Sequence, residues 1–143
     1  MYIKQLSVFI ENKAGRLAEA LKVLSDNGID ISALSIADTS EFGILRMIVS
    51  DPALAKEKLF ESGVIVKTTE VMGIVLEDKP GSLANVVALL ADNGIVVEYA
   101  YAFLGCDKEK ALVVISVDNQ EGAVEILKNS GVTTINPSDI YRV

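Results

Sequence analysis

An internal repeat constrains the fold of this chain more than any other sequence feature. Residues Glu11–Gly28 and Glu77–Gly94 are identical at nine of eighteen positions, at an offset of 66 residues. Unrelated segments of this length would share about one residue at ordinary amino-acid usage. The tripeptide Ser-Gly-Val at 62–64 recurs at 130–132, an offset of 68, which predicts a two-residue insertion, placed here in the Gly105–Lys110 loop. The chain is therefore a tandem duplication, and both copies should share one fold.

Each copy is predicted to form strand, helix, strand, strand, helix and strand. Alternating side chains favour strands, and leucines spaced along one side favour helices. In the first copy the predicted ranges are Ile3–Ile10, Gly15–Asn27, Ile29–Ala37, Phe42–Ser50, Pro52–Ser62 and Val64–Val66. In the second copy they are Val71–Leu76, Gly81–Asn93, Ile95–Leu104, Lys110–Val117, Asn119–Asn129 and Val132–Ile135, and the tail adds a short strand, Ile140–Val143.

This order of elements predicts an α+β fold made of two ferredoxin-like βαββαβ modules. Each module would have an antiparallel four-stranded sheet with both helices on one face. We place the modules at residues 1–70 and 71–143. Because no flexible linker separates them, they should pack against each other. The uncovered, apolar sheet faces predict a contact between modules or between two chains, such as a homodimer.

Composition excludes several classes of function. The 143-residue chain contains no histidine, which removes the commonest general base and most zinc chemistry. Its single cysteine, Cys106, excludes internal disulfides and cysteine-rich metal sites. A net charge of −7 argues against nucleic acid and against an anionic membrane surface. Without a signal-like or membrane-spanning run, we expect a cytoplasmic protein whose partner is a small ligand or another protein.

The loop that precedes the first helix of each copy is the candidate site. Glu11-Asn12-Lys13-Ala14-Gly15-Arg16-Leu17 and Glu77-Asp78-Lys79-Pro80-Gly81-Ser82-Leu83 both end in the first turn of a predicted helix. Free amides and the helix dipole suit a small anion there, and glycine lets a ligand approach the backbone. Two structural alternatives stay open: Asn12 or Asp78 caps the helix, or the glycines serve close helix–sheet packing.

These motifs resemble those of the ACT domain, a ferredoxin-like module that binds amino acids. The first copy, Glu11-Asn12-x-Ala14-Gly15-x-Leu17 followed by Asn27-Gly28-Ile29, is similar to the regulatory subunits of acetohydroxyacid synthase. The second copy, Asp78-Lys79-Pro80-Gly81-Ser82-Leu83, matches the more general Asp-x-Pro-Gly-x-Leu form. The resemblance covers nearly the whole chain.

The resemblance implies a ligand held between modules, by the loop before the first helix and by the start of a neighbouring second strand. Asn12 and Asp78 would bind its polar groups, and nearby backbone amides would bind its carboxylate. Asp30 would contact the ligand across an interface, but its counterpart is Val96, so the two sites are not equivalent. The implied ligand-binding residues are Asn12, Ala14, Gly15, Arg16, Leu17, Asp30, Asp78, Gly81, Ser82 and Leu83.

The sequence therefore predicts a stand-alone regulatory protein that binds free amino acids and signals to a partner, such as a regulated enzyme. We expect no cofactor, no metal and no catalytic activity, because no carboxylate has a recognisable base, nucleophile or metal partner. Two alternatives remain: an interaction module without ligand, and an RNA-binding module of the same element order. The second lacks the expected basic residue, because Glu41 stands there. If one site alone is occupied, we expect the first.

Overall fold

The computed structural model describes residues 2–38, 42–105 and 109–140, and the chain divides into two compact units. The N-terminal unit comprises Lys4–Glu70. The C-terminal unit comprises Val71–Asp139 together with Tyr2 and Ile3.

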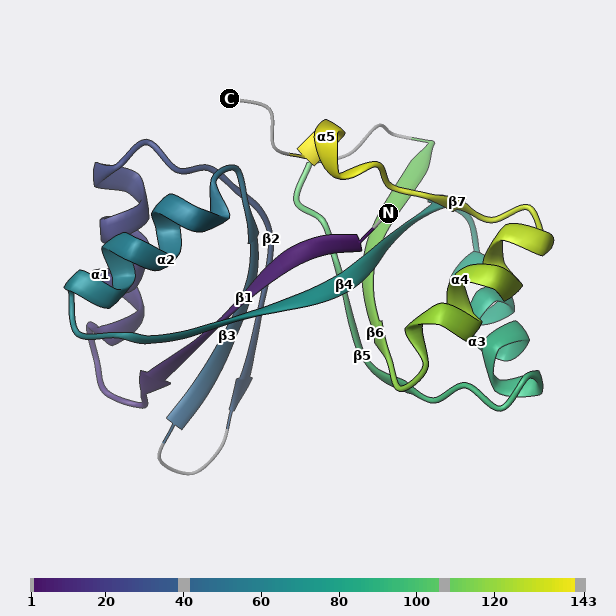
Figure 1. Cartoon of the computed structure of the whole chain (residues 1–143), viewed down its shortest axis with the longest axis horizontal. Helices are drawn as coiled ribbons and strands as arrows, with labels where there is room; N and C mark the ends of the chain where they lie inside the picture. Colours follow the sequence, from purple (N-terminus) through teal and green to yellow (C-terminus); the bar gives the residue numbers. More distant parts are fainter. Residues whose placement is uncertain (1, 39–41, 106–108, 141–143) are drawn as a thin grey trace. The chain divides into compact units, whose positions relative to one another are not determined.

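The N-terminal unit is a βαββαβ module, as predicted. Its elements are β1 (Tyr2–Glu11), α1 (Arg16–Asp26), β2 (Ile31–Asp38), β3 (Phe42–Val49), α2 (Pro52–Glu61) and the first part of β4 (Ile65–Glu77). Its strands lie in the order β2-β3-β1-β4, and both helices cover one face of the sheet (Figure 1). This is the ferredoxin-like order.

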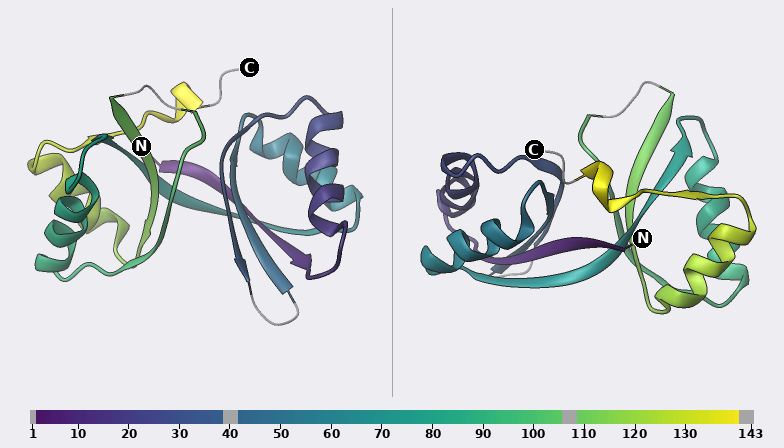
Figure 2. Two further views of the ribbon diagram at one scale, coloured as in Figure 1. Left: turned by 180° about the vertical axis from the view of Figure 1, so that it is seen from behind. Right: turned by 45° about the horizontal axis from the view of Figure 1, so that its top comes forward.

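The C-terminal unit repeats the module. After the second part of β4 come α3 (Ser82–Asp92), β5 (Val97–Ala102), β6 (Lys110–Val117), α4 (Gln120–Asn129) and β7 (Thr133–Thr134). Its strand order is β5-β6-β4-β7, and its two helices again share one face of the sheet (Figure 2). The predicted α+β fold class is confirmed in both units.

Each unit has its own hydrophobic core between helices and sheet. In the N-terminal unit, the register that pairs Leu6 with Met47 and Val8 with Leu45 directs these side chains toward the helices. Leu24 of α1 and Leu59 of α2 complete this core and are fully buried. The alternation that predicted the strands is the alternation that fills the core.

The second helix of each unit begins at a capping side chain. The Asp51 carboxylate accepts a hydrogen bond from the Leu54 amide (3.1 Å), and the Asn119 side chain accepts one from the Gly122 amide (3.0 Å). These side chains satisfy amides that have no partner within the helix. The predicted start of α2 at Asp51-Pro52 is confirmed.

Two predicted strands are corrected. Val64–Val66 and Val71–Leu76 are not separate, because β4 runs without interruption from Ile65 to Glu77. Its polar middle contains threonines, which suit strands, and Thr69 accepts a hydrogen bond from the Gln5 side chain of β1 (3.2 Å).

The predicted final strand is also wrong at its start. Ile140 ends a short helix, α5 (Pro137–Ile140), instead. The Asn136 side chain accepts a hydrogen bond from the Ser138 amide (3.1 Å), and proline suits the first helical position. Residues 141–143, most of the Asp38–Glu41 hairpin loop, and Cys106 within the predicted insertion lie outside the described residues.

Candidate functional site

The β1–α1 loop has the same backbone path in both units. In the N-terminal unit, the Lys13 amide donates to the Glu11 carbonyl (2.8 Å) and the Arg16 amide donates to the Lys13 carbonyl (3.2 Å). In the C-terminal unit, the corresponding bonds join Lys79 to Glu77 (2.9 Å) and Ser82 to Lys79 (3.3 Å). The repeated sequence therefore builds a repeated loop.

Each loop also carries an ion pair at its base. The Lys13 ammonium lies 3.2 Å from the Glu11 carboxylate, and the Lys79 ammonium lies 2.8 Å from the Glu77 carboxylate. The hydrogen bond and charge of Lys79 lower the pKa of Glu77, and the same contact raises the pKa of Lys79. Both pairs are exposed, so each contributes little to stability.

Glycines occupy the N-cap positions of α1 and α3, so the capping role considered for Asn12 and Asp78 is not the one that they have. Gly15 has φ 88° and Gly81 has φ 92°, a left-handed conformation that favours glycine. A Cβ atom at either glycine would meet nothing within 4 Å. The glycines therefore serve the turn, and the close-packing explanation is wrong.

The first turn of α1 presents backbone donors to the loop. The Arg16 amide bonds to Lys13 and the Glu19 amide bonds to Gly15. This leaves the Leu17 and Ala18 amides at helix positions that have no intrahelical acceptor. The helix dipole adds a partial positive charge at this end.

Beside this turn lies a cavity of about 140 Å³, which we call the loop cavity. It is lined by Ile10, Glu11, Asn12, Lys13, Leu17, Ile36, Gly43 and Leu45. Its walls are mainly apolar, with Asn12 as a neutral polar group at the rim. The closest approach across it is at Gly43, where an added Cβ atom would lie 3.4 Å from Asn12 Oδ1. The cavity thus exists partly because Gly43 has no side chain.

The C-terminal unit has different residues at the corresponding positions. Gly43 pairs with Ile10 across β3 and β1, whereas Ala111 pairs with Leu76 across β6 and β4. The side chain of Ala111 packs against the core of its unit. The methyl group that Gly43 lacks is therefore present in the second copy.

The structure distributes the predicted site residues of the first copy among several places. Asn12 and Leu17 line the loop cavity, whereas Arg16 lines a different cavity with Glu19. Asp30 lies beyond the opposite end of α1, at an open hollow of about 420 Å³. Its amide donates to the Ser50 hydroxyl (2.9 Å) and its side chain is exposed. Within one unit, Asp30 and Asn12 are separated by the length of a helix.

The remaining predicted residues lie on the two loops. Ala14 and Gly15 are exposed at the start of α1. In the second copy, Asp78 is exposed and its amide donates to the Glu109 carbonyl (2.9 Å). Gly81, Ser82 and Leu83 form the first turn of α3, and Leu83 is 43% exposed.

Two lining residues of the loop cavity, Ile36 and Gly43, were not predicted from sequence. Both come from the β2–β3 hairpin, which the motif does not include. The repeat carried a usable signal, since Gly43 aligns with Ala111 at the offset of 68 residues.

Neither a metal site nor a membrane helix is found in the part of the chain that the structure describes. Within residues 2–38, 42–105 and 109–140, no three acidic, histidine or cysteine side chains are grouped to hold a metal ion. Over the same ranges, no helix has the length and apolar character needed to cross a membrane.

Comparisons with known proteins agree with the fold. A family model described as an ACT domain pair matches residues 1–143. The crystal structure of a protein from Bacteroides thetaiotaomicron is 42% identical, with a TM-score of 0.92, and the match covers 100% of this chain and 98% of that one. No curated protein is significantly similar in sequence.

More distant structures share the fold alone. The ligand-free regulatory subunit of aspartate kinase from Thermus thermophilus is 14% identical, with a TM-score of 0.63, over 88% of this chain and 90% of that one. The corresponding subunit from Thermus flavus is 17% identical, with a TM-score of 0.61, over 90% and 92%.

Proposed function

The chain belongs to the family of ACT domain pairs, and from that membership we propose that it is a regulatory protein that binds a free amino acid at the loop cavity of its N-terminal unit. The observation that carries the proposal is the cavity itself, because it combines backbone donors, one amide side chain and apolar walls. Amino-acid binding needs these three elements.

Each part of the ligand has a counterpart in the loop cavity. The carboxylate would accept hydrogen bonds from the first-turn amides of Leu17 and Ala18, assisted by the helix dipole. Asn12 Oδ1 would accept a hydrogen bond from the ammonium group. The apolar side chain would lie against Ile10, Ile36 and Leu45. These walls favour an aliphatic amino acid, in keeping with the likeness of the first copy to acetohydroxyacid synthase regulatory subunits.

The size of the loop cavity supports a site shared between modules. Closed small-molecule pockets measure about 300–1,000 Å³, whereas this cavity measures about 140 Å³. A second ACT-like module, such as one from a homodimer partner, would complete the site, and Asp30 is the polar residue that it would contribute. The second copy, with Ala111 in place of Gly43, would have a structural role.

Binding would regulate a partner by linkage. A ligand that prefers one arrangement of modules shifts the population toward it by its difference in affinity. The name of the similar Thermus protein, a regulatory subunit of aspartate kinase, supports a regulated enzyme as the partner. We place the protein in the cytoplasm, where free amino acids and their enzymes meet.

Thermal unfolding against each of the twenty amino acids tests the proposal. A ligand at about 100 times its Kd stabilises by about 2.7 kcal/mol, which corresponds to a shift of roughly 5–10 °C. The shift should disappear in Asn12→Ala and persist in Asp78→Ala, the matched change in the other loop. If no amino acid raises the Tm of the native protein, the proposal is wrong, and an interaction module without ligand becomes the better account.

A further inference from the structure

The N-terminal unit contains a larger cavity, of about 320 Å³, which we call the helix cavity. It lies between α1, the end of β1 and the turn from α2 into β4. Its lining residues are Phe9, Ile10, Glu11, Arg16, Glu19, Ala20, Val23, Ser62, Gly63 and Val64. It shares Ile10 and Glu11 with the loop cavity, but Asn12 and Gly43 do not line it. Its volume falls within the range of small-molecule pockets.

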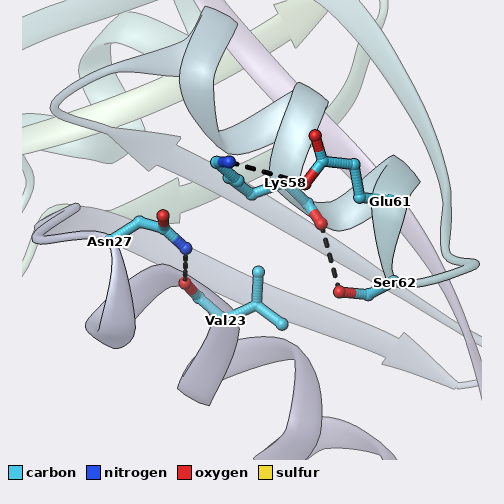
Figure 3. A network of polar contacts seen from close by, with 5 residues as sticks. All are labelled: Val23, Asn27, Lys58, Glu61 and Ser62. Atoms are coloured by element: carbon cyan, nitrogen blue, oxygen red, sulfur yellow. Dashed lines mark hydrogen bonds and ion pairs between the residues drawn. The ribbon is translucent and has the colours of Figure 1, made fainter.

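The walls of the helix cavity combine charges of both signs with apolar surface. Arg16 Nη1 lies 3.1 Å from Glu19 Oε2, and the Glu11 carboxylate stands beside them. Phe9 is 41% exposed. Val23 of α1 and Ser62, at the end of α2, come from two helices that lie near each other (Figure 3).

The second copy provides an internal comparison, because it keeps the turn and changes the cavity. The tripeptide Ser-Gly-Val of the α2–β4 turn recurs at residues 130–132. At the α1 positions, however, Ser82, Asn85, Val86 and Leu89 replace Arg16, Glu19, Ala20 and Val23. Both charges are lost, and both apolar side chains are larger. The charged, hollow form belongs to the first copy alone.

We propose that the helix cavity is a second ligand site, separate from the loop cavity, that binds a small zwitterion with a bulky apolar group. The carboxylate of the ligand would contact the Arg16 guanidinium, and its ammonium group would contact Glu19 and Glu11. The apolar group would lie against Val23 and the exposed ring of Phe9.

The charge pattern selects a zwitterion over a single ion. An anion alone would face the Glu11 and Glu19 carboxylates, and a cation alone would face Arg16. A zwitterion meets both and exchanges one exposed ion pair for two. Rearranging the Arg16–Glu19 pair costs little, because exposed pairs contribute little to stability.

Three matched probes test this site: L-phenylalanine, 3-phenylpropanoate and 2-phenylethylamine. They share the ring, and the second and third each lack one of the two charges. Titrations followed by 15N–1H NMR report binding at individual amides. We expect L-phenylalanine to shift the amides of Val23, Gly63 and Val64. Each single-ion probe should bind about tenfold more weakly, the effect of one lost charge-assisted hydrogen bond.

Variants separate this site from the loop cavity and from general effects. Arg16→Gln should weaken L-phenylalanine binding about tenfold, whereas Lys22→Gln, which breaks the exposed Lys22–Asp26 pair of the same helix, should not. The double variant Ala20→Val with Val23→Leu introduces side chains that the second copy already accommodates, and it should abolish binding. Gly43→Ala should leave binding intact.

The proposal is overturned if L-phenylalanine at about 100 times the concentration used for the protein leaves these amides unshifted. It is also overturned if Arg16→Gln and Lys22→Gln bind the probe equally, or if shifts at Val23 and Gly63 disappear in Gly43→Ala. The last outcome would show one continuous site centred on the loop cavity.

Discussion

Two strand glycines differ in what surrounds them. A Cβ atom at Gly73 would lie 2.6 Å from Ile3 Cδ1 and 2.8 Å from Ile135 Cδ1, whereas one at Gly43 would lie no closer than 3.4 Å to any atom. Gly73→Ala should therefore lower the free energy of unfolding by about 1–3 kcal/mol. Gly43→Ala, the matched control, should change it by less than about 1 kcal/mol. Urea denaturation measures both, and equal losses would contradict this packing argument.

Gly43 also tests the proposed function at the scale of one methyl group. Gly43→Ala places that methyl group in the loop cavity next to Asn12, so it should reduce the amino-acid-dependent rise in Tm. Ala111→Gly, the reciprocal change in the second copy, should leave that rise unchanged. A full ligand-dependent shift in Gly43→Ala would show that the ligand binds elsewhere.

The Glu77–Lys79 pair predicts a pH effect of known sign. Lys79 lowers the pKa of Glu77 from its ordinary 4.5. Any stability from this shift is present above the unfolded pKa and is lost as pH falls through the folded one. Lys79→Gln should move the Glu77 pKa back toward 4.5, which an NMR titration of the carboxyl carbon measures. An unchanged Glu77 pKa would mean that Lys79 does not act on it.

At the scale of elements, the two side-chain caps make equivalent contributions in the two copies. Asp51→Ala and Asn119→Ala each remove the acceptor of one first-turn amide. Each should lower the free energy of unfolding by about 1 kcal/mol. Glu57→Ala, on the exposed side of α2, should have little effect and serves as the control. Differential scanning calorimetry compares them, and a cap variant as stable as Glu57→Ala would contradict the prediction.

Most elements could be predicted because their signals are local. Asp51-Pro52 contains both the cap and the first helical residue, and Asn27-Gly28 contains the stop that ends α1. The continuity of β4 could not be predicted, because its polar segment resembles a break until Gln5 supplies a partner for Thr69. That partner lies 64 residues away.

The candidate site was predicted in part for the same reason. The motif identified Asn12 and the glycine turn, which are contiguous in sequence. The cavity opposite them depends on Gly43 and Ile36, which reach Asn12 through the pairing of β3 with β1 and β2. Sequence spacing also grouped Arg16 with Asn12, whereas the helical turn directs Arg16 into another cavity.

At the scale of the whole molecule, one residue of the first strand belongs to the second copy's core. Ile3 is fully buried and lies in the C-terminal unit. Ile3→Ala should lower the free energy of unfolding by about 2–5 kcal/mol. Ile65→Ala should cost little, because Ile65 is 69% exposed.

Hydrogen exchange locates the effect. The Ile135 amide, which donates to the Gly73 carbonyl (2.7 Å), should exchange faster in Ile3→Ala than in Ile65→Ala. Unchanged exchange at Ile135 would mean that Ile3 is not required by this core.

The meeting of Ile3 with Ile135 over Gly73 has a consequence for how the protein is made. The ribosome produces Ile3 almost first and Ile135 almost last, so their contact waits for nearly the entire chain. Contacts of such long sequence separation slow folding. During synthesis, the start of β1 would remain an unsatisfied apolar strand end, a site where a chaperone could bind the nascent chain.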